Sequence, residues 1–327
     1  MTGVPEGERS DAGDHEHSSR AEFRAQMHQR RVELERQLEA SRAQFDQAQE
    51  RINARTGRNL FLAVGIGVAF GGTLLLSLLV IKELFMVFAV VVAAFSSSEL
   101  ASALRNGGYR VPRVPTVAVA IVAVPVAYYG GGAGQLAAVL GGMLLVVLWR
   151  IAEQASPAVR TASNGLVRDL GAVLLVQAYV VFLATFTVVL TAAEGGQWWT
   201  LAFIIIAVAA DTGAYASGLM FGRHPMAPVI SPKKTWEGFA GGALASVVAG
   251  VILSIFMLGN TWWFGLIFGA AIFLTATLGD LAESLIKRDL GIKDMSSWLP
   301  GHGGFLDRLD SILPSAAVAF VAFRVFG

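Results

Sequence analysis

Apolar residues run in long blocks through most of the chain after residue 58, and shorter polar stretches separate these blocks. Each block is close to the ~20 residues that an α-helix needs to cross a hydrocarbon core ~30 Å thick. The pattern predicts nine membrane-spanning helices, at residues 59–81, 84–104, 115–129, 134–153, 169–193, 197–220, 237–258, 261–286 and 304–326. We therefore expect an all-α, polytopic integral membrane protein. The Gly-rich piece at 130–134 is expected to form a turn or a close helix contact.

The first 58 residues are polar and differ from the rest of the chain. Residues 1–19 are rich in Gly, Ser and Asp, and we expect disorder there because such a composition buries too little apolar area to offset the entropy of ordering. Residues 21–55 are rich in Glu, Arg, Gln and Ala, and an incomplete heptad pattern predicts a charged helix. This helix is either solvated or membrane-surface bound, or it is a short coiled coil that binds a partner.

Composition narrows the class of protein. The chain has 327 residues, of which 54% are hydrophobic and 15% are charged, whereas soluble domains average about 25% charged residues. A soluble enzyme is therefore disfavoured. The formal net charge of +1 argues against a nucleic-acid partner, because neutralising phosphates requires a basic surface. The absence of Cys excludes disulfides, thiolate nucleophiles and Cys-ligated zinc.

Lys and Arg residues fall in alternate loops between the predicted spans. With the N-terminal tail inside, the inner loops contain Arg105, Arg110, Arg113, Arg160, Arg168, Arg223, Lys233, Lys234, Lys287, Arg288 and Lys293. The outer loops then contain only Lys82. Cytoplasmic loops carry the excess of basic residues, so we expect a cytoplasmic N-terminus and, with nine spans, an external C-terminus.

Acidic residues inside the predicted spans are functional candidates, because a charge in the hydrocarbon core is costly. They are Glu99, Asp211, Asp280, Glu283, Asp307 and Asp310. In the predicted topology all of them lie in the cytoplasmic half, where like charges repel unless cations are bound. Asp307 and Asp310 are expected on one face of the ninth helix. For Glu99 we favour a local hydrogen bond within the run Ser96–Glu99.

Basic and hydroxyl side chains gather in two inner loops beside these acids. The loop 221–239 contains Lys233 and Lys234 next to Ser231 and Thr235, and residues 279–310 contain several Lys and Arg with a Gly-flanked His302. Together these residue types suit a Mg²⁺–polyphosphate complex, which needs oxygen ligands for a hard cation and N–H donors for phosphate. The usual glycine-rich nucleotide-binding loops are absent.

Each of these features also has a structural interpretation. Asp211 fits a satisfied polar kink in a helix, and Asp307 with Arg308 fits an interfacial ion pair. Lys233 and Lys234 fit a membrane-surface anchor, and His302 fits an ordinary loop residue. A different class of function is also open: midplane acids and Gly-interrupted helices occur in ion-coupled transporters. Their sites lie near the midplane, whereas these acids are displaced to one side beside phosphate-type basic loops.

Three stretches carry a resemblance to a known family. Residues 284–310, SLIKRDLGIKDMSSWLPGHGGFLDRLD, resemble the signature of the phosphatidate cytidylyltransferases, also called CDP-diacylglycerol synthases. DTGAY at 211–215 and SPKKTWEG at 231–238 are similar to family motifs in the same order. The resemblance is strong over about residues 165–327 and rests only on the helix pattern over 59–164. We therefore divide the chain into a tail (1–58), N-terminal transmembrane helices (59–164) and a catalytic transmembrane region (165–327).

The resemblance implies Mg²⁺-dependent transfer of a cytidylyl group from CTP to phosphatidate in the cell membrane, for phospholipid biosynthesis. It implies a two-cation centre, Mg²⁺ with a cation such as K⁺, at Asp280, Asp307 and Asp310, and a homodimer. Catalytic roles are expected for Lys287, Arg288, His302 and Arg308, and substrate contacts for Ser231, Lys234, Thr235, Ser284, Gly303 and Gly304. Asp211 is expected to shape the polar cavity, and the amides of Gly303 and Gly304 to offer an anion site at a helix N-terminus.

A closer alternative is a membrane lipid or polyprenol kinase that uses CTP as phosphoryl donor. The products separate the two enzymes, because cytidylyl transfer releases pyrophosphate and a kinase releases CDP. Binding of CTP separates both from a transporter. A general base is optional in the transferase, since phosphatidate is already ionised near neutral pH and the main obstacle is repulsion between two anions.

Overall fold

The structure is a computed structural model that describes residues 60–155, 165–296, 298 and 303–327. The chain divides into two units, Met1–Ala63 and Val64–Gly327, and the fold described below is that of the second unit. The disorder and the charged helix that we predict in residues 1–58 lie outside the described residues, as does His302.

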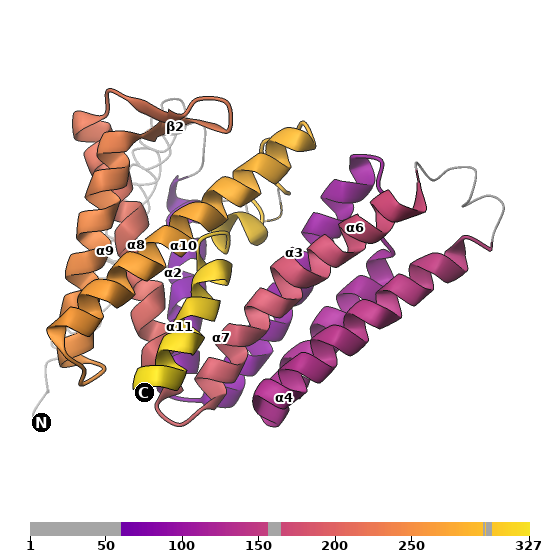
Figure 1. Ribbon diagram of the computed structural model, residues 1–327, viewed down its shortest axis with the longest axis horizontal. Coiled ribbons are helices and arrows are strands. Elements are labelled where there is room, and N and C mark those ends of the chain that lie inside the picture. The colour runs from indigo at the N-terminus through magenta and orange to yellow at the C-terminus, as the bar shows by residue number, and fades with distance from the viewer. Residues whose placement is uncertain (1–59, 156–164, 297, 299–302) are drawn as a thin grey trace, which may run out of the picture. The chain divides into compact units, whose positions relative to one another are not determined.

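The described residues are mainly helical, in agreement with the hydrophobic pattern (Figure 1). The helices are α2 (Leu60–Leu79), α3 (Lys82–Asn106), α4 (Arg113–Glu153), α6 (Leu166–Val176), α7 (Leu183–Ala192), α8 (Gly196–Phe221), α9 (Trp236–Phe256), α10 (Trp262–Asp289) and α11 (Ile312–Phe326). A π-helical segment, Gln177–Phe182, joins α6 to α7. Six of the helical stretches in the described part of the chain are long and apolar enough to cross a membrane. The prediction of a polytopic membrane protein is confirmed.

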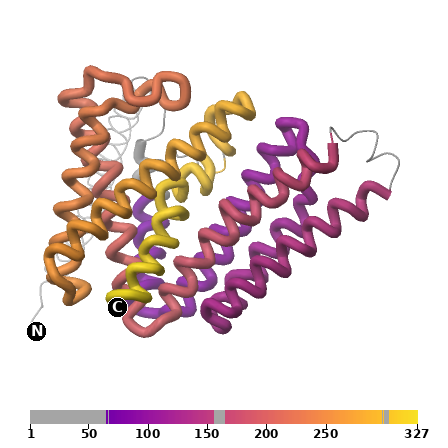
Figure 2. Tube along the Cα trace, in the orientation of Figure 1, coloured from indigo at the N-terminus to yellow at the C-terminus, as the bar shows by residue number. Residues whose placement is uncertain are grey.

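The third and fourth predicted spans are the two arms of α4. Its backbone leaves helical geometry at Gly131, with φ of 56° and ψ of −148°, a conformation open to glycine at little steric cost. A side chain on Gly142 would collide with Val119, so residues far apart in sequence touch where the arms run side by side (Figures 1 and 2). The Gly-rich piece at 130–134 therefore forms the predicted turn.

A two-stranded hairpin follows α8, in a loop where the sequence pattern predicted no strand. Strand β1 (Pro225–Ala227) pairs antiparallel with β2 (Ser231–Thr235), with Pro225 opposite Thr235. The Glu237 carboxylate accepts hydrogen bonds from the backbone N–H groups of Arg223 and His224 at the base of the hairpin. The β2 sequence SPKKT lacks the alternation of apolar and polar residues that identifies a strand, which is why the pattern missed it.

Helices α8, α9 and α10 pack closely through glycine (Figure 1). A Cβ atom on Gly213 of α8 would lie 2.8 Å from the carbonyl oxygen of Gly241 in α9. One on Gly269 of α10 would lie 2.5 Å from the carbonyl oxygen of Ser246 in α9. Small residues of this kind let helix backbones approach in membranes. Here they allow α8 and α10 to pack closely against α9.

The predicted ninth span starts too early. Helix α11 begins at Ile312 rather than at residue 304, and the preceding residues form a 3₁₀ turn, η2 (Leu306–Arg308). Asp307 lies in this turn and Asp310 follows it, so the expectation that they share one helix face is wrong. Their carboxylates bond to nearby backbone N–H groups, which competes with regular helix formation.

The residues around this turn share a core with the N-terminal helices. Leu306 and Leu309 belong to the same buried cluster as Leu100 and Leu104 of α3 and Val173 of α6. All five side chains are less than one tenth exposed. The segment of the chain that carries the family-like motif is therefore packed directly against α3, which lies about 200 residues earlier in the sequence.

Replacing Gly269 by Val tests the close contact between α9 and α10. We expect Gly269→Val to lower the free energy of unfolding by about 1–3 kcal/mol, because overpacking forces backbones apart. Gly141→Val is the matched control, since a side chain at Gly141 would meet nothing within 4 Å. The thermal unfolding midpoints in detergent decide the matter, and equal midpoints for the two variants would contradict the packing argument.

Candidate functional site

A cavity of about 580 Å³ lies among α8, the hairpin, α9 and α10. Its polar lining includes Asp211, Lys233, Lys234, Thr235, Thr277 and Asp280. Its apolar lining includes Tyr215, Leu219, Met226, Phe239 and Phe273. Both predicted motifs before the signature, at 211–215 and 231–238, thus face one cavity together with Asp280, and the cavity offers both charged and apolar surface.

An ion pair joins the hairpin to α10 in this cavity. Lys234 Nζ lies 2.5 Å from Asp280 Oδ2, and the two side chains are 24% and 31% exposed. Ser284, one turn along α10, donates a hydrogen bond to Asp280 Oδ1 at 3.4 Å. Because both charged groups retain contact with solvent, a phosphate can reach the ammonium and a cation can reach the carboxylate.

Thr235 ends β2 and caps α9. Its hydroxyl oxygen accepts a hydrogen bond from the N–H of Gly238 at 3.1 Å, which satisfies one of the free donors at the helix start. The cap fixes the end of the hairpin against α9 and so holds the neighbouring Lys234 at the cavity. Arg288 ties the hairpin to α10 from the other side, donating from Nε to the carbonyl oxygen of Ile230 at 3.2 Å.

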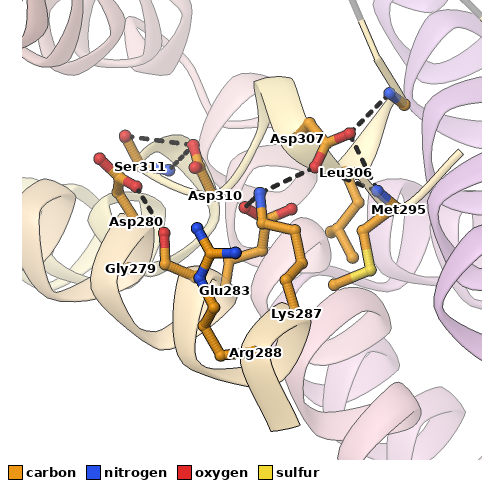
Figure 3. A network of polar contacts seen from close by, with 12 residues as sticks. Gly279, Asp280, Glu283, Lys287, Arg288, Met295, Leu306, Asp307, Asp310 and Ser311 are labelled. Carbon is orange, nitrogen blue, oxygen red and sulfur yellow. Dashed lines mark hydrogen bonds and ion pairs between the residues drawn. The ribbon is translucent and has the colours of Figure 1, made fainter. Parts of the chain in front are cut away.

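A second polar network lies beside the cavity, around Lys287 (Figure 3). The Lys287 ammonium donates to Glu283 Oε2 at 2.6 Å and to Asp307 Oδ1 at 3.0 Å. Glu283 is completely buried, and its other oxygen has no hydrogen-bond partner among the described residues. Lys287, which we predicted to hold phosphate, is thus paired with two carboxylates of the protein itself.

Asp307 is bound on both oxygens. Its Oδ2 atom accepts hydrogen bonds from the N–H groups of Gly304 at 2.7 Å and Met295 at 3.2 Å. Burial would raise the pKa of Asp307, but the hydrogen bonds that its carboxylate accepts from Gly304 and Lys287 outweigh burial and lower that pKa. The Gly304 N–H is therefore used within the protein, and helix α11 begins only at Ile312. This amide does not lie at a helix N-terminus as predicted, and the substrate contact of Gly303 stays a prediction.

Asp310 belongs to a different group of carboxylates. Its Oδ1 atom accepts hydrogen bonds from the N–H and the hydroxyl of Ser311, at 2.7 and 3.2 Å. Burial, and then the negative charges of Asp280 and Asp211, raise the pKa of Asp310 to about 6. A side chain on Gly279 would collide with the Asp310 carbonyl, so this glycine lets the turn before α11 lie directly against α10.

The three predicted metal ligands are not all brought together. The negative charge of Asp280 acts on Asp310 and contributes to its raised pKa, whereas Asp307 points to Lys287 and Met295 (Figure 3). Within the described residues, no three His, Asp or Glu side chains form a group that would hold a metal ion. Arg308 is exposed on the turn and Ser231 begins β2.

Sequence reasoning misassigned Glu99. The local hydrogen bond that we favoured within Ser96–Glu99 is not what Glu99 makes: its carboxylate accepts from Ser296, Phe305 and Leu306. These donors lie about 200 residues away in the chain. A buried acid in the middle of an apolar helix was the available signal, but the sequence contained nothing to identify the partner.

Comparisons with known proteins agree with the motifs. A family model described as "Cytidylyltransferase family" matches residues 62–326. A phosphatidate cytidylyltransferase of Mycobacterium bovis is 38% identical over 279 residues, which cover 83% of this chain and 90% of that protein. One of Mycobacterium tuberculosis is 38% identical over 83% of this chain and 84% of its own length. One of Staphylococcus saprophyticus is 44% identical over 124 residues, 38% of this chain and 47% of the relative.

The pairing of Lys287 with buried Glu283 predicts a large effect on stability. Lys287→Met leaves Glu283 buried without a countercharge, and we expect a loss of about 3–5 kcal/mol in the free energy of unfolding. The double variant Glu283→Gln/Lys287→Met should recover part of this loss. Lys293→Met, at an exposed position just after α10, is the control. Unfolding midpoints measure the effect, and an unchanged midpoint for Lys287→Met would show that the pair is not structural.

Proposed function

Because the chain belongs to the cytidylyltransferase family, we propose that the cavity among α8, the hairpin, α9 and α10 is the place where its reaction occurs. The chain transfers the cytidylyl group of CTP to phosphatidate and forms CDP-diacylglycerol. The observation that carries the location is the accessible pair Lys234–Asp280. It presents a phosphate-binding ammonium and a cation-binding carboxylate side by side in one cavity.

The basic residues around the cavity would bind the phosphates of the two substrates. Lys234 would exchange Asp280 for the triphosphate of CTP, with Lys233 and Thr235 beside it on β2. The exposed side chains of Arg288 and Arg308 would bind the lipid phosphate. Substrate contacts stay predictions for Ser231, Ser284 and Gly303, as does a catalytic role for His302. Lys287 would contribute to phosphate binding only after it loosens its contacts with Glu283 and Asp307.

The carboxylates of Asp280 and Asp310 would bind a Mg²⁺ ion. They offer the oxygen ligands that a hard cation prefers. The negative charges of Asp280 and Asp211 add to burial in raising the pKa of Asp310, and a bound cation would relieve this repulsion. Bound Mg²⁺ would neutralise charge on the two anionic reactants. Asp307 does not fit this group in its present orientation. A second cation such as K⁺ stays a prediction of the family resemblance.

The chemistry requires approach of one anion to another. A phosphatidate oxygen attacks the α-phosphorus of CTP in line, the new P–O bond forms, and the bond to the β-phosphate oxygen breaks to release pyrophosphate. Phosphatidate is ionised near neutral pH, so no base has to remove a proton. Lys234 and the nearby arginines therefore contribute by neutralising charge and aligning the phosphates.

We place this cavity on the cytoplasmic side of a cell-membrane protein with nine spans. The support is the reversal of α4 at Gly131, which divides a helical stretch of 41 residues into two arms. The excess of Lys and Arg in alternate loops supports the orientation. CTP would then reach the cavity from the cytoplasm, and phosphatidate from the adjacent leaflet.

A homodimer also stays a prediction. It rests on the family resemblance and on small-residue faces that suit helix association in membranes. Chemical crosslinking in native membranes, followed by electrophoresis, tests it directly.

Asp280→Asn tests the proposed site. We expect CDP-diacylglycerol formation to fall at least ~100-fold, since several kcal/mol of charge stabilisation are lost at a metal site. Radiolabelled CTP is incubated with phosphatidate and Mg²⁺, and lipid product and pyrophosphate are measured. Asp289→Asn, at an exposed position on the same helix, is the control and should keep wild-type activity. Full activity in Asp280→Asn would refute the site, and release of CDP by the wild type would indicate a kinase.

The absence of Cys allows a clean test of orientation. Val229→Cys in the hairpin and Glu194→Cys between α7 and α8 introduce single thiols at exposed positions. We expect a membrane-impermeant maleimide to label Val229→Cys in inside-out vesicles and Glu194→Cys in right-side-out vesicles. The opposite labelling pattern would reverse the proposed orientation, and labelling of both positions from one side would contradict the number of spans.

A further inference from the structure

Glu99 of α3 lies next to the segment that carries the family signature, and no role in the reaction has been attached to it. We propose that Glu99 is a positioning residue for cytidylyl transfer, which holds the turn η2 and thereby the carboxylate of Asp307 in place. This inference rests on the proposed function, because Asp307 and Lys287 belong to the polar network beside the proposed site.

The carboxylate of Glu99 binds residues on either side of positions 297–304. Oε1 accepts a hydrogen bond from the Ser296 hydroxyl at 2.5 Å and one from the Phe305 N–H at 3.0 Å. Oε2 accepts one from the Leu306 N–H at 2.9 Å. Glu99 is only 2% exposed, and all three contacts use it as an acceptor, the role of an ionised carboxylate. Such bonds are stronger than those between neutral groups.

Three consecutive N–H groups at the start of η2 are divided between two carboxylates. Asp307 accepts from Gly304, and Glu99 accepts from Phe305 and Leu306. The turn that Glu99 holds is therefore the turn that carries Asp307. Because Asp307 Oδ1 also accepts from Lys287, a shift of the turn would move Asp307 away from Lys287 and disturb the network next to the cavity.

The residues around Glu99 leave space for its carboxylate and pack the same face of α3 against neighbouring aromatic rings. A Cβ atom on Gly304 would lie 2.7 Å from Glu99 Oε2, so a glycine at this position makes room for the carboxylate. Phe95, one turn earlier on the same face of α3, stacks on Phe305 with ring centroids 4.9 Å apart. It also contacts Trp298 edge-on at 5.1 Å. Phe95 and Glu99 on this face of α3 thus contact Ser296 and Trp298 on one side, and Phe305 on the other.

Glu99→Gln is the central test variant. Its amide nitrogen is a donor and would face backbone donors, so only one oxygen remains to accept. We expect kcat to fall about 100-fold, the effect of a ~1 Å misplacement in an active site. The KM for CTP should stay within about twofold of wild type. Among the described residues, the hydrogen-bond partners of Glu99 do not line the cavity, so ground-state binding is expected to be unchanged. Glu99→Asp keeps both acceptors and should restore part of kcat.

Ser97→Ala is the matched control. Ser97 is buried on the same helix, and its hydroxyl has no hydrogen-bond partner among the described residues, so this variant should keep wild-type kcat. All rates are normalised to the folded fraction from size-exclusion chromatography. If Glu99→Gln does not fold, Ser296→Ala, which removes one of the three donors, carries the test and should show a smaller fall in kcat.

A second readout does not depend on activity. When Asp307 moves, Lys287 loses one of its two carboxylate partners, so its modification by an amine-reactive reagent, followed by peptide mass spectrometry, should rise in Glu99→Gln and not in Ser97→Ala. Unchanged kcat and unchanged Lys287 modification in both Glu99→Gln and Ser296→Ala would overturn the inference. A wild-type protein that forms no CDP-diacylglycerol would overturn the proposed function and this catalytic role with it, even if the modification pattern upheld the geometry.

Discussion

The ion pair of Lys287 with Glu283 and Asp307 is the interaction on which the arrangement of the signature segment depends. Glu283 lies on the buried face of α10, where an unpaired charge would be strongly destabilising. Lys287 satisfies it one turn away and also reaches Asp307 beyond the end of α10. From Asp307 the contacts continue to the backbone of Gly304 and Met295. Through Lys287, one buried acid thus links α10 to the turn that precedes α11.

The polar residues near the cavity fall into two groups that differ in accessibility. The side chains of Lys234 and Asp280 form a pair and are 24% and 31% exposed. Each can therefore leave the other and bind a ligand instead. Glu283 and Glu99 are almost wholly buried and bind partners within the protein. The first group suits binding of charged substrates, and the second suits holding the surrounding backbone in one geometry. This division follows from solvent access. When an exposed charge leaves its partner, water can solvate it, whereas a buried charge that loses its partner stays unsolvated at a high cost in free energy.

Three glycines near the turn η2 make room for other groups of the protein. A side chain at Gly303 would meet Asp307, one at Gly304 would meet Glu99, and one at Gly279 would meet the carbonyl of Asp310. The sequence alone predicts that the amides of Gly303 and Gly304 bind an external anion, because exposed amides bind anions. The anions that approach these backbone positions are nevertheless carboxylates from α3 and from η2, and the sequence does not reveal which anion lies there.

The sequence by itself determined the membrane character, the positions of the apolar helices and the turn at 130–134, because these depend on local composition and on the length needed to cross a bilayer. It also identified the family, through motifs with many fixed polar positions. Only the tertiary structure decided the hairpin that carries Lys234, the separation of Asp307 from Asp310, and the partners of Glu99. The hydrogen bonds of Glu99 to Phe305 and Leu306 join residues 206 and 207 positions apart. Such a pairing depends on how helices pack and which buried donors need an acceptor, and no local pattern records it.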